Sequence, residues 1–396
     1  MNFLVEVLNI VMPSGQTKEF LQKGLFIPEP KPIGSYSPDD VIFLLKDIGG
    51  LIEEQDNEER ERLVQNGCHY SEMLPIEYRP NTEYIELFYQ SLKETSVRIA
   101  HAVGLVAMTL LKDPYKKIVL VSLARAGTPA GILIKRYIKL VSGINLPHYS
   151  ISIIRDKGID ENALLYILRK HPECKLQFID GWTGKGVIAG ELRASLKAFR
   201  EKYAIEINSS LAVLADPGYC AAIFGTREDF LIPSACLNAT VSGLVSRTVF
   251  RKDLIGDTDF HGAKFYAEMA DEDLSNYFID AVSGSFALVR EAVSKTLEYN
   301  QSAVLDNFPS FRGLRDIERI KEEYGIGNIN YIKPGVGETT RVLLRRVPWK
   351  VLVKDAANPD LKHIFLLAEE RGVSVECCPD MSYSCCGLVK TVVDKK

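Results

Sequence analysis

The sequence predicts an α/β protein with a large body, built on a parallel sheet, and a small α/β module at the C-terminal end. In the middle of the chain, short β-branched runs alternate with helical patterns, which is typical of parallel β-α-β units with helices on both sheet faces. After about residue 325 the alternation starts afresh, so we expect a second domain. The expected body elements are strand 118–123, helix 129–141, strand 148–154, helix 160–170, strand 176–180, helix 186–202 and strand 211–215.

The N-terminal part of the chain differs from this alternating core. Prolines punctuate residues 1–80, and apolar residues at helical spacing predict one long helix over 83–111. We interpret residues 1–112 as a helical hood over the sheet. A helical region at 271–299 and a charged connector at 314–324 follow the core. The body is therefore assigned to residues 1–320 and the C-terminal module to residues 327–396.

The composition is that of an ordinary soluble enzyme. The 396 residues are 46% hydrophobic and 25% charged, with a net charge of −4, so the whole chain does not look like a nucleic-acid-binding protein. The longest apolar stretch, 99–111, contains His101 and is too short to cross a bilayer. The eight cysteines include two adjacent pairs and do not form a disulfide framework. We expect a reduced, cytoplasmic protein with no membrane partner, and an oligomer is compatible with the sequence.

Two glycine-containing loops follow directly after predicted strands. Ala124–Gly127 follows strand 118–123, Gly181–Gly186 follows strand 176–180, and a helical pattern comes after each. Such loops leave backbone N–H groups unpaired at the positive end of a helix, which is what a phosphate group needs. At the carboxyl edge of a parallel sheet the two loops would hold a ligand with two phosphorylated ends.

The order of strands and loops resembles that of the type I phosphoribosyltransferases. In that family the first loop holds the pyrophosphate of 5-phosphoribosyl 1-diphosphate (PRPP), and the second cradles its 5′-phosphate. The resemblance implies that Arg125 contacts the pyrophosphate, Asp180 a ribose hydroxyl, and Arg155 the acceptor or the pyrophosphate. It also implies a Mg²⁺ ion held by the ligand and Asp180. The ligand-holding positions would be Ala126, Gly127, Thr128, Gly181, Thr183, Gly184, Lys185 and Gly186.

One feature departs from the family pattern. The family places two neighbouring carboxylates at the second loop, whereas here Asp180 is followed by Gly181. Asp216 is the candidate for the missing carboxylate. The reaction asks mainly for charge stabilisation rather than for a strong base. The main prediction is therefore magnesium-dependent transfer of a phosphoribosyl group to a base-like acceptor, or its removal from one.

A second candidate chemistry rests on a cysteine and a histidine. Cys236 and His261 could form the thiolate–imidazolium pair of a cysteine peptidase, with Asn238 or Asp259 as the orienting group. The alternative interpretation is a small buried cysteine and a satisfied loop histidine. The sequence does not decide between the two.

Four segments carry a resemblance over nearly the whole chain. Residues 34–46, residues 69–75 and the segments around Cys236 and His261 resemble a bacterial family encoded in tellurite-resistance and stress gene clusters. This family has been described both as phosphoribosyltransferase-like and as cysteine protease StiP. The two loops occur in order, whereas the cysteine and histidine stand alone, so the sequence favours the transferase for this chain.

The C-terminal module resembles the pelota-type, kink-turn RNA-binding domains. Gly335–Leu343 opens a helix in the family's manner, and strand 349–353, helix 361–370 and strand 373–377 are expected to follow. The resemblance implies that RNA meets Gly337, Glu338, Arg341 and Arg345, and that the apolar loop 379–383 packs on bases. The alternatives are a docking domain of the same fold and, for the whole chain, a non-catalytic RNA-binding or scaffold protein.

Overall fold

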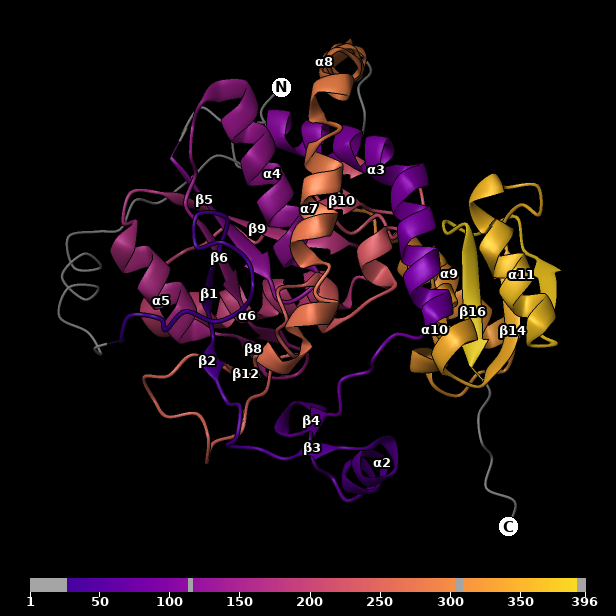
Figure 1. The fold of residues 1–396 in the computed structure, drawn as a ribbon, viewed down its shortest axis with the longest axis horizontal. Coiled ribbons are helices and arrows are strands. Elements are labelled where there is room, and N and C mark those ends of the chain that lie inside the picture. Colours follow the sequence, from indigo (N-terminus) through magenta and orange to yellow (C-terminus); the bar gives the residue numbers. More distant parts are fainter. Residues whose placement is uncertain (1–26, 113–116, 303–308, 390–396) are drawn as a thin grey trace.

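A six-stranded parallel sheet forms the centre of the body (Figure 1). The computed structural model describes residues 27–112, 117–302 and 309–389. Every neighbouring pair of strands in this sheet is parallel, which confirms the predicted α/β class. The assignment to the type I phosphoribosyltransferase fold stays a prediction. The strand order is β1 (Ile42–Leu44), β6 (His148–Ile151), β5 (Ile118–Leu123), β9 (Lys175–Trp182), β10 (Leu211–Ala215) and β11 (Ile223–Thr226).

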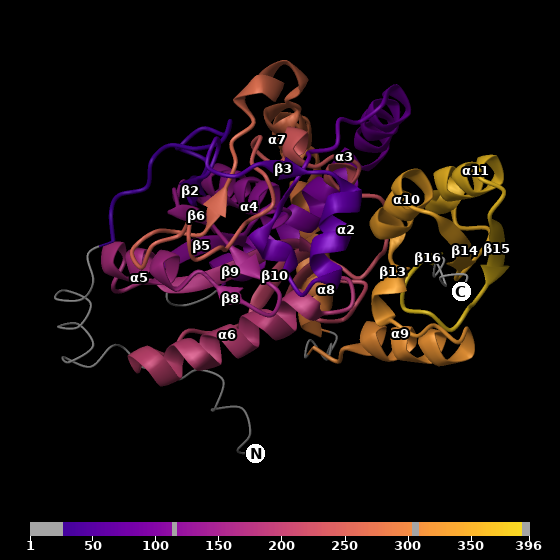
Figure 2. The ribbon, with the colours of Figure 1, turned by 90° about the horizontal axis from the view of Figure 1, so that it is seen from below.

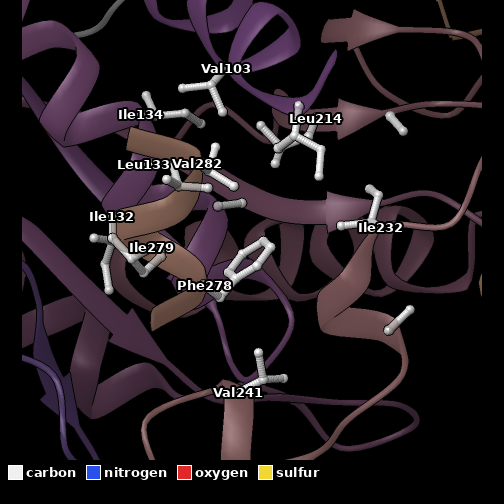
Figure 3. Packing of buried hydrophobic residues seen from close by; sticks show 14 of the residues in the cluster. Val103, Ile132, Leu133, Ile134, Leu214, Ile232, Val241, Phe278, Ile279 and Val282 are labelled. Atoms are coloured by element: carbon white, nitrogen blue, oxygen red, sulfur yellow. The ribbon is translucent and has the colours of Figure 1, made fainter. Parts of the chain in front are cut away.

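Helices cover both faces of the sheet because successive side chains of a strand point to opposite faces. In β5, Leu120 packs in one apolar cluster, whereas Val119 and Val121 pack in another. Figure 3 shows the first cluster, in which Val103 and Phe278 lie near Leu214 of β10. Helices α3 (Thr82–Leu111), α4 (Gly127–Ser142), α7 (Ser275–Ser283) and α8 (Phe286–Ser302) supply the first cluster, and α5 (Glu161–Lys170) and α6 (Val187–Tyr203) supply the second.

The predicted N-terminal hood is wrong in extent. Strand β1 is part of the main sheet, and α3 packs against α4, α8 and β11 as a core helix. By length and composition α3 could cross a membrane, yet 56% of its most apolar window is buried in the protein. Within the described residues, only one small unit resembles a hood, and it lies apart from the sheet (Figure 1). It contains β3 (Glu54–Gln55), α2 (Asn57–Gln65), η2 (Tyr70–Glu72) and β4 (Leu74–Pro75). Residues 1–26 of the predicted hood lie outside the described residues.

Short elements connect the body helices and strands. The predicted strand 148–154 is divided at Ser152 into β6 and β7, and the predicted helical region 271–299 is divided into α7 and α8. The remaining body elements are β2 (Lys46–Asp47), β7 (Ile153–Ile154), β8 (Gly158–Ile159), η3 (Pro233–Ala235), η4 (Ala239–Val241), β12 (Gly262–Ala263) and η5 (Ala267–Glu272).

The tail module has its own four-stranded sheet and lies beside the body (Figure 2). The predicted connector 314–324 is instead helix α9 (Arg312–Glu323), because its apolar residues Ile317 and Ile320 pack in the tail core with Leu352. Helices α10 (Val336–Arg345) and α11 (Lys362–Glu370) cover the other face. The strand order is β13 (Ile332–Pro334), β16 (Cys385–Val389), β14 (Pro348–Val353) and β15 (Ser374–Cys377), with η6 (Ile329–Tyr331) and η7 (Pro359–Leu361) in the connections.

Helix α4 approaches the sheet so closely that Gly131 has no room for a side chain. A Cβ atom there would lie 2.2 Å from Ser122 Oγ and 2.4 Å from His148 Nε2. We expect Gly131→Ala to lower the free energy of unfolding by about 1–3 kcal/mol through overpacking. Gly190 in helix α6 is the matched control, because nothing lies within 4 Å of its Cβ position. Gly190→Ala should raise the free energy of unfolding by about 0.5–1 kcal/mol. Urea unfolding of both variants measures the difference, and an equal response would contradict this packing.

Candidate functional site

The two glycine loops meet at the centre of the carboxyl edge of the sheet. From β5 the chain continues to β6 on one side and later to β9 on the other, so the strand order reverses between β5 and β9. A Cβ atom on Gly127 would lie 2.4 Å from the carbonyl oxygen of Ile179, and one on Gly181 would lie 3.1 Å from that of Ala126. Such a reversal point is where open α/β sheets bind ligands.

The first loop is held by contacts within the protein. Arg125 forms an ion pair with the carboxylate of Glu77 at 3.3 Å and donates to the carbonyl oxygen of Val245 at 3.2 Å. Glu77 also accepts a hydrogen bond from the Ala239 backbone, so it joins this loop to the segment around Cys236. Thr128 is fully buried and its hydroxyl bonds to Ser150, which turns it away from the predicted ligand. Glu77 has no motif that would have identified it from the sequence.

The second loop lines a cavity of about 220 Å³ between the body and the tail module. Burial raises the pKa of Asp180 there to about 7, while one of its carboxylate oxygens accepts from the Gly181 backbone at 2.8 Å. Lys185 donates to the carbonyl oxygens of Ile329 and Ile332 at 2.7 and 3.1 Å, and thereby reaches across to the tail. The polar and charged residues around the cavity are Arg155, Asp180, Thr183, Lys185, Asn330, Lys333 and Glu338. Lys333 and Asn330 come from the tail, and no motif in the sequence indicates that they lie beside this loop.

Asp216 does not serve as a second carboxylate at this loop. It is fully buried, accepts from the hydroxyl of Thr183 at 2.5 Å and from the backbone of Cys220 at 2.8 Å, and forms an ion pair with Arg227. Because its oxygens are occupied by these donors, Asp216 fixes the loop rather than facing a ligand. In the described part of the chain, no group of three or more His, Cys, Asp and Glu side chains could hold a metal ion. Magnesium held through Asp180 and a bound pyrophosphate stays a prediction.

The structure does not bring Cys236 and His261 together. The thiol of Cys236 is 1% exposed and lies near Ser91 and the side chains of Arg341 and Arg345; burial raises its pKa to about 12. His261 bonds through Nδ1 to Ser152 at 2.9 Å, and burial lowers its pKa. All eight cysteines and six histidines lie within the described residues, and among these no cysteine is hydrogen-bonded to a histidine. Asn238 is hydrogen-bonded to neither of the two: its carbonyl oxygen accepts from the Val241 backbone and the Ser242 hydroxyl. Asp259 forms an ion pair with Lys46 instead.

The predicted RNA-binding face of the tail module is docked on the body. Arg341 donates to the carbonyl oxygen of Ala235, and Arg345 to that of Cys236, each at 2.8 Å. Glu338 forms an ion pair with Arg341 on the same helix. A Cβ atom on Gly337 would meet Ala235 at 3.0 Å, so this glycine allows the close approach.

A body carboxylate occupies the N-terminal end of helix α10. The Val336 and Ser384 backbones donate to Asp229 at 3.0 and 2.8 Å, and the Asp229 side chain is buried. A negative group at a helix N-terminus is favoured by the helix dipole and the free N–H groups. The resemblance placed RNA at this end of the helix, but here Asp229 lies there.

The remaining predicted features of the tail are also internal. Met381 and Tyr383 of the loop 379–383 are fully buried in the tail core, and the Tyr383 hydroxyl donates to the carbonyl oxygen of Gly184. Cys385 and Cys386 pack in different clusters, because neighbouring residues of a strand point to opposite faces.

Comparison with known proteins identifies two regions. Residues 34–283 match the family described as "Tellurite-like stress resistance cysteine protease StiP", and residues 311–391 match the pelota RNA-binding domain. A protein of Acinetobacter baylyi named "Cysteine protease StiP" is 37% identical over 344 residues, which cover 84% of this chain and 87% of that protein.

Two solved structures show weak likeness. A hypothetical protein from Neisseria gonorrhoeae with bound ppGpp is 12% identical with a TM-score of 0.22, and covers 31% of this chain and 68% of its own. The xanthine-guanine-hypoxanthine phosphoribosyltransferase of Helicobacter pylori is 18% identical with a TM-score of 0.21, and covers 34% and 77%. TM-scores this low do not establish a shared fold.

These matches overturn the main functional prediction. The family match and the Acinetobacter relative both name a cysteine protease, so the predicted phosphoribosyl transfer is wrong. Glycine loops of this kind also serve as tight strand-to-helix turns, so their presence alone does not indicate phosphoribosyl transfer.

The burial of Cys236 predicts a thiol that reacts slowly in the intact protein. With its pKa raised to about 12, only about one thiol in 10⁴ is ionised at pH 8. Iodoacetamide should therefore label the exposed Cys377 long before Cys236. In the double variant Arg341→Ala, Arg345→Ala, which loses two bonds to the Cys236 segment, we expect labelling of Cys236 to rise by about 10-fold or more. Peptide mass spectrometry over a time course measures both rates, and rapid labelling of Cys236 in the wild type would contradict the closed arrangement.

Proposed function

The chain belongs to the StiP family of tellurite-like stress resistance cysteine proteases, and we propose that it is itself a cysteine peptidase whose nucleophile is Cys236. A cysteine peptidase attacks a peptide carbonyl with a thiolate, so its nucleophile needs neighbouring positive charge. The observation that carries the choice of Cys236 is that the charges near its thiol, Arg341 and Arg345, are both positive.

The other cysteines of the family match are poorer candidates. Cys174 precedes β9 at the amino edge of the sheet, away from the loops. The thiol of Cys220 is buried, and the negative charge of Asp216 further raises its pKa. Cys68 lies in the peripheral unit between α2 and η2. The four remaining cysteines belong to the pelota-type region rather than to the StiP match.

We infer that the described arrangement is a closed form of this peptidase. Burial is the largest influence on the pKa of Cys236 and outweighs both arginines. Helix α10 contributes to that burial, since two of its side chains bind the carbonyl oxygens of Ala235 and Cys236. A small displacement of α10 that admits water but keeps Arg341 and Arg345 near the thiol would lessen the burial and lower the pKa of Cys236.

His363 of helix α11 is hydrogen-bonded to α10, the helix that covers Cys236. Its Nε2 lies 3.0 Å from the hydroxyl of Thr340, the residue before Arg341, and Glu94 lies near it one turn along α3 from Ser91. Burial lowers its pKa to about 4, so it is neutral at pH 7 and able to accept a proton. His363 lies in the pelota-type region and is tied to α10, so we do not assign it as the base of a peptidase built on the StiP region.

Substitution of the thiol tests the proposal. We expect Cys236→Ser to lower the rate of cleavage of a fluorogenic peptide panel by on the order of 10³-fold or more, as loss of a nucleophile does. Cys174→Ser is the matched control and should retain activity. An unchanged melting temperature verifies folding, and a fully active, folded Cys236→Ser protein would refute the assignment.

A second candidate function is RNA binding by the tail, which the pelota-domain match supports. The pelota-type resemblance places RNA at the N-terminal end of α10, and in this structure Asp229 occupies that end. We therefore infer that RNA and the body compete for α10. Binding of a structured RNA would then release the segment that covers Cys236.

The competition predicts how RNA affinity responds to Asp229. We expect the wild type to bind a kink-turn RNA weakly and Asp229→Asn to bind about 10-fold more tightly, because removal of one charged hydrogen-bond partner weakens docking. Arg341→Glu should abolish binding in both backgrounds. A mobility-shift titration measures the affinities, and equal affinity of the wild type and Asp229→Asn would contradict competition.

A further inference from the structure

The peripheral unit formed by β3, α2, η2 and β4 meets the body along a boundary that is mainly polar. In the described chain the apolar cluster at this boundary holds four buried side chains, of which only Leu74 belongs to the unit. The other contacts are polar: Lys264 pairs with Glu54 at 2.9 Å, and the Phe250 backbone donates to the carbonyl oxygen of Ser71 at 2.8 Å. Segments with few buried apolar contacts open at a low free-energy cost, so we expect this unit to separate from the body before the central sheet opens.

Buried polar atoms without a hydrogen-bond partner gather at the same boundary. Oε1 of Glu54 on the unit, and Nε of Arg247 and the hydroxyl of Tyr266 on the body, bond to no residue that the structure describes. Tyr266 is 2% exposed, and its hydroxyl lies near the carboxylates of Glu54 and Glu77 without the geometry of a hydrogen bond to either. Folded proteins rarely leave such groups unpaired, so the three atoms point to a partner from outside the described chain.

These three side chains lie in one electrostatic neighbourhood. Burial, and after it the carboxylates of Glu77 and Glu54, raises the pKa of Tyr266. Burial lowers the pKa of Arg247 to about 10. The charges of Arg125 and Glu77 act on both Tyr266 and Arg247. The unpaired atoms are therefore grouped around the Arg125–Glu77 ion pair rather than scattered along the boundary.

Glu77 connects this group to the candidate nucleophile. Its carboxylate accepts from the Ala239 backbone at 3.0 Å, and Ala239 follows Cys236 by three residues. The same carboxylate is held by Arg125 at 3.3 Å. A molecule that lies along the boundary would therefore reach the segment that carries the thiol.

The unpaired atoms are complementary to a peptide group. An ionised Glu54 can only accept a hydrogen bond, Arg247 can only donate one, and the Tyr266 hydroxyl can do either. A peptide group presents one N–H donor and one C=O acceptor, so it can satisfy the carboxylate and the guanidinium together. An anion would pair with Arg247 but leave Glu54 without a donor, and a metal cation would do the reverse. The mixed set favours a polypeptide over an ionic ligand.

We propose that the boundary between the peripheral unit and the body binds an extended polypeptide segment, which enters when the unit separates from the body. A peptide N–H would donate to Glu54, and the carbonyl oxygen would accept from Arg247 or Tyr266. The choice of a polypeptide as the ligand rests on the proposed peptidase function. The site would hold the substrate on the side of the Cys236 segment that Glu77 contacts, whereas α10 covers that segment from the tail.

Anisotropy titration of fluorescein-labelled casein tests the site in the full-length Cys236→Ser protein, which would leave the probe uncleaved. We expect saturable binding that Tyr266→Phe weakens about 10-fold, since a hydroxyl that bonds to the bound chain is lost. This hydroxyl has no partner among the described residues, so the substitution should leave the melting temperature unchanged or raise it. Ser283→Ala is the matched control, because it also removes a buried hydroxyl without a partner in the described chain, but at the end of α7. It should leave the affinity for casein unchanged.

Hydrogen exchange of the same protein measures the opening. The backbone amides of the peripheral unit should exchange faster than those of the central strands β5 and β9, because the unit separates without unfolding of the sheet. Exchange of the unit that is as slow as that of the central strands would overturn the proposed entry of the polypeptide.

The binding outcomes are independent of peptide cleavage. No saturable binding up to about 0.3 mM protein, on the order of weak specific affinities, would overturn the proposal. Equal affinities of the folded Tyr266→Phe and Ser283→Ala proteins would also overturn it, since an ordered water alone would then satisfy the hydroxyl. Failure of the peptidase assignment gives a different result: Cys236→Ser retains cleavage, while the dependence of casein binding on Tyr266 is unaffected.

Discussion

The contact between Asp229 and the start of helix α10 is the interaction on which the arrangement of the two modules depends. The carboxylate accepts from the Val336 and Ser384 backbones, and burial raises its pKa to about 6. A buried carboxylate is costly unless donors surround it, so the helix end and Asp229 need each other. Further along the same helix, Arg341 and the last residue, Arg345, donate to the carbonyl oxygens of Ala235 and Cys236.

Apolar packing continues across this polar contact. Val336 and Leu343 of α10 belong to the same buried cluster as Ala235 and Cys236 of the body. Arg98 of α3 adds ion pairs to Glu228 of the body and Asp360 of the tail, which are partly exposed and contribute less. The tail is therefore joined to the body through a common core, and the covering of Cys236 follows from that core.

Contacts within the body explain why residues expected to meet a ligand instead meet the protein. Arg125, Thr128 and Asp216 were placed at a ligand by their positions in glycine loops, but each satisfies a buried polar group of the chain. A polar side chain beside a loop looks the same in sequence whether its partner is a ligand or a residue far away in the chain. The partners here lie between 22 and 48 residues away, as Ser150, Thr183 and Glu77 show.

The pattern of apolar residues was enough to predict the parallel sheet, most of its helices and the tail module, because this pattern is local and shows which face of each element is buried. It also placed both glycine loops at the carboxyl edge of the sheet, where β5 and β9 lie side by side. Only the tertiary structure decided that α3 is a core helix, that α9 belongs to the tail, and that Lys333 faces Lys185. These three arrangements depend on contacts between segments that are distant in the sequence. Neither the spacing of apolar residues nor the spacing of motifs indicates which other element a helix or strand packs against.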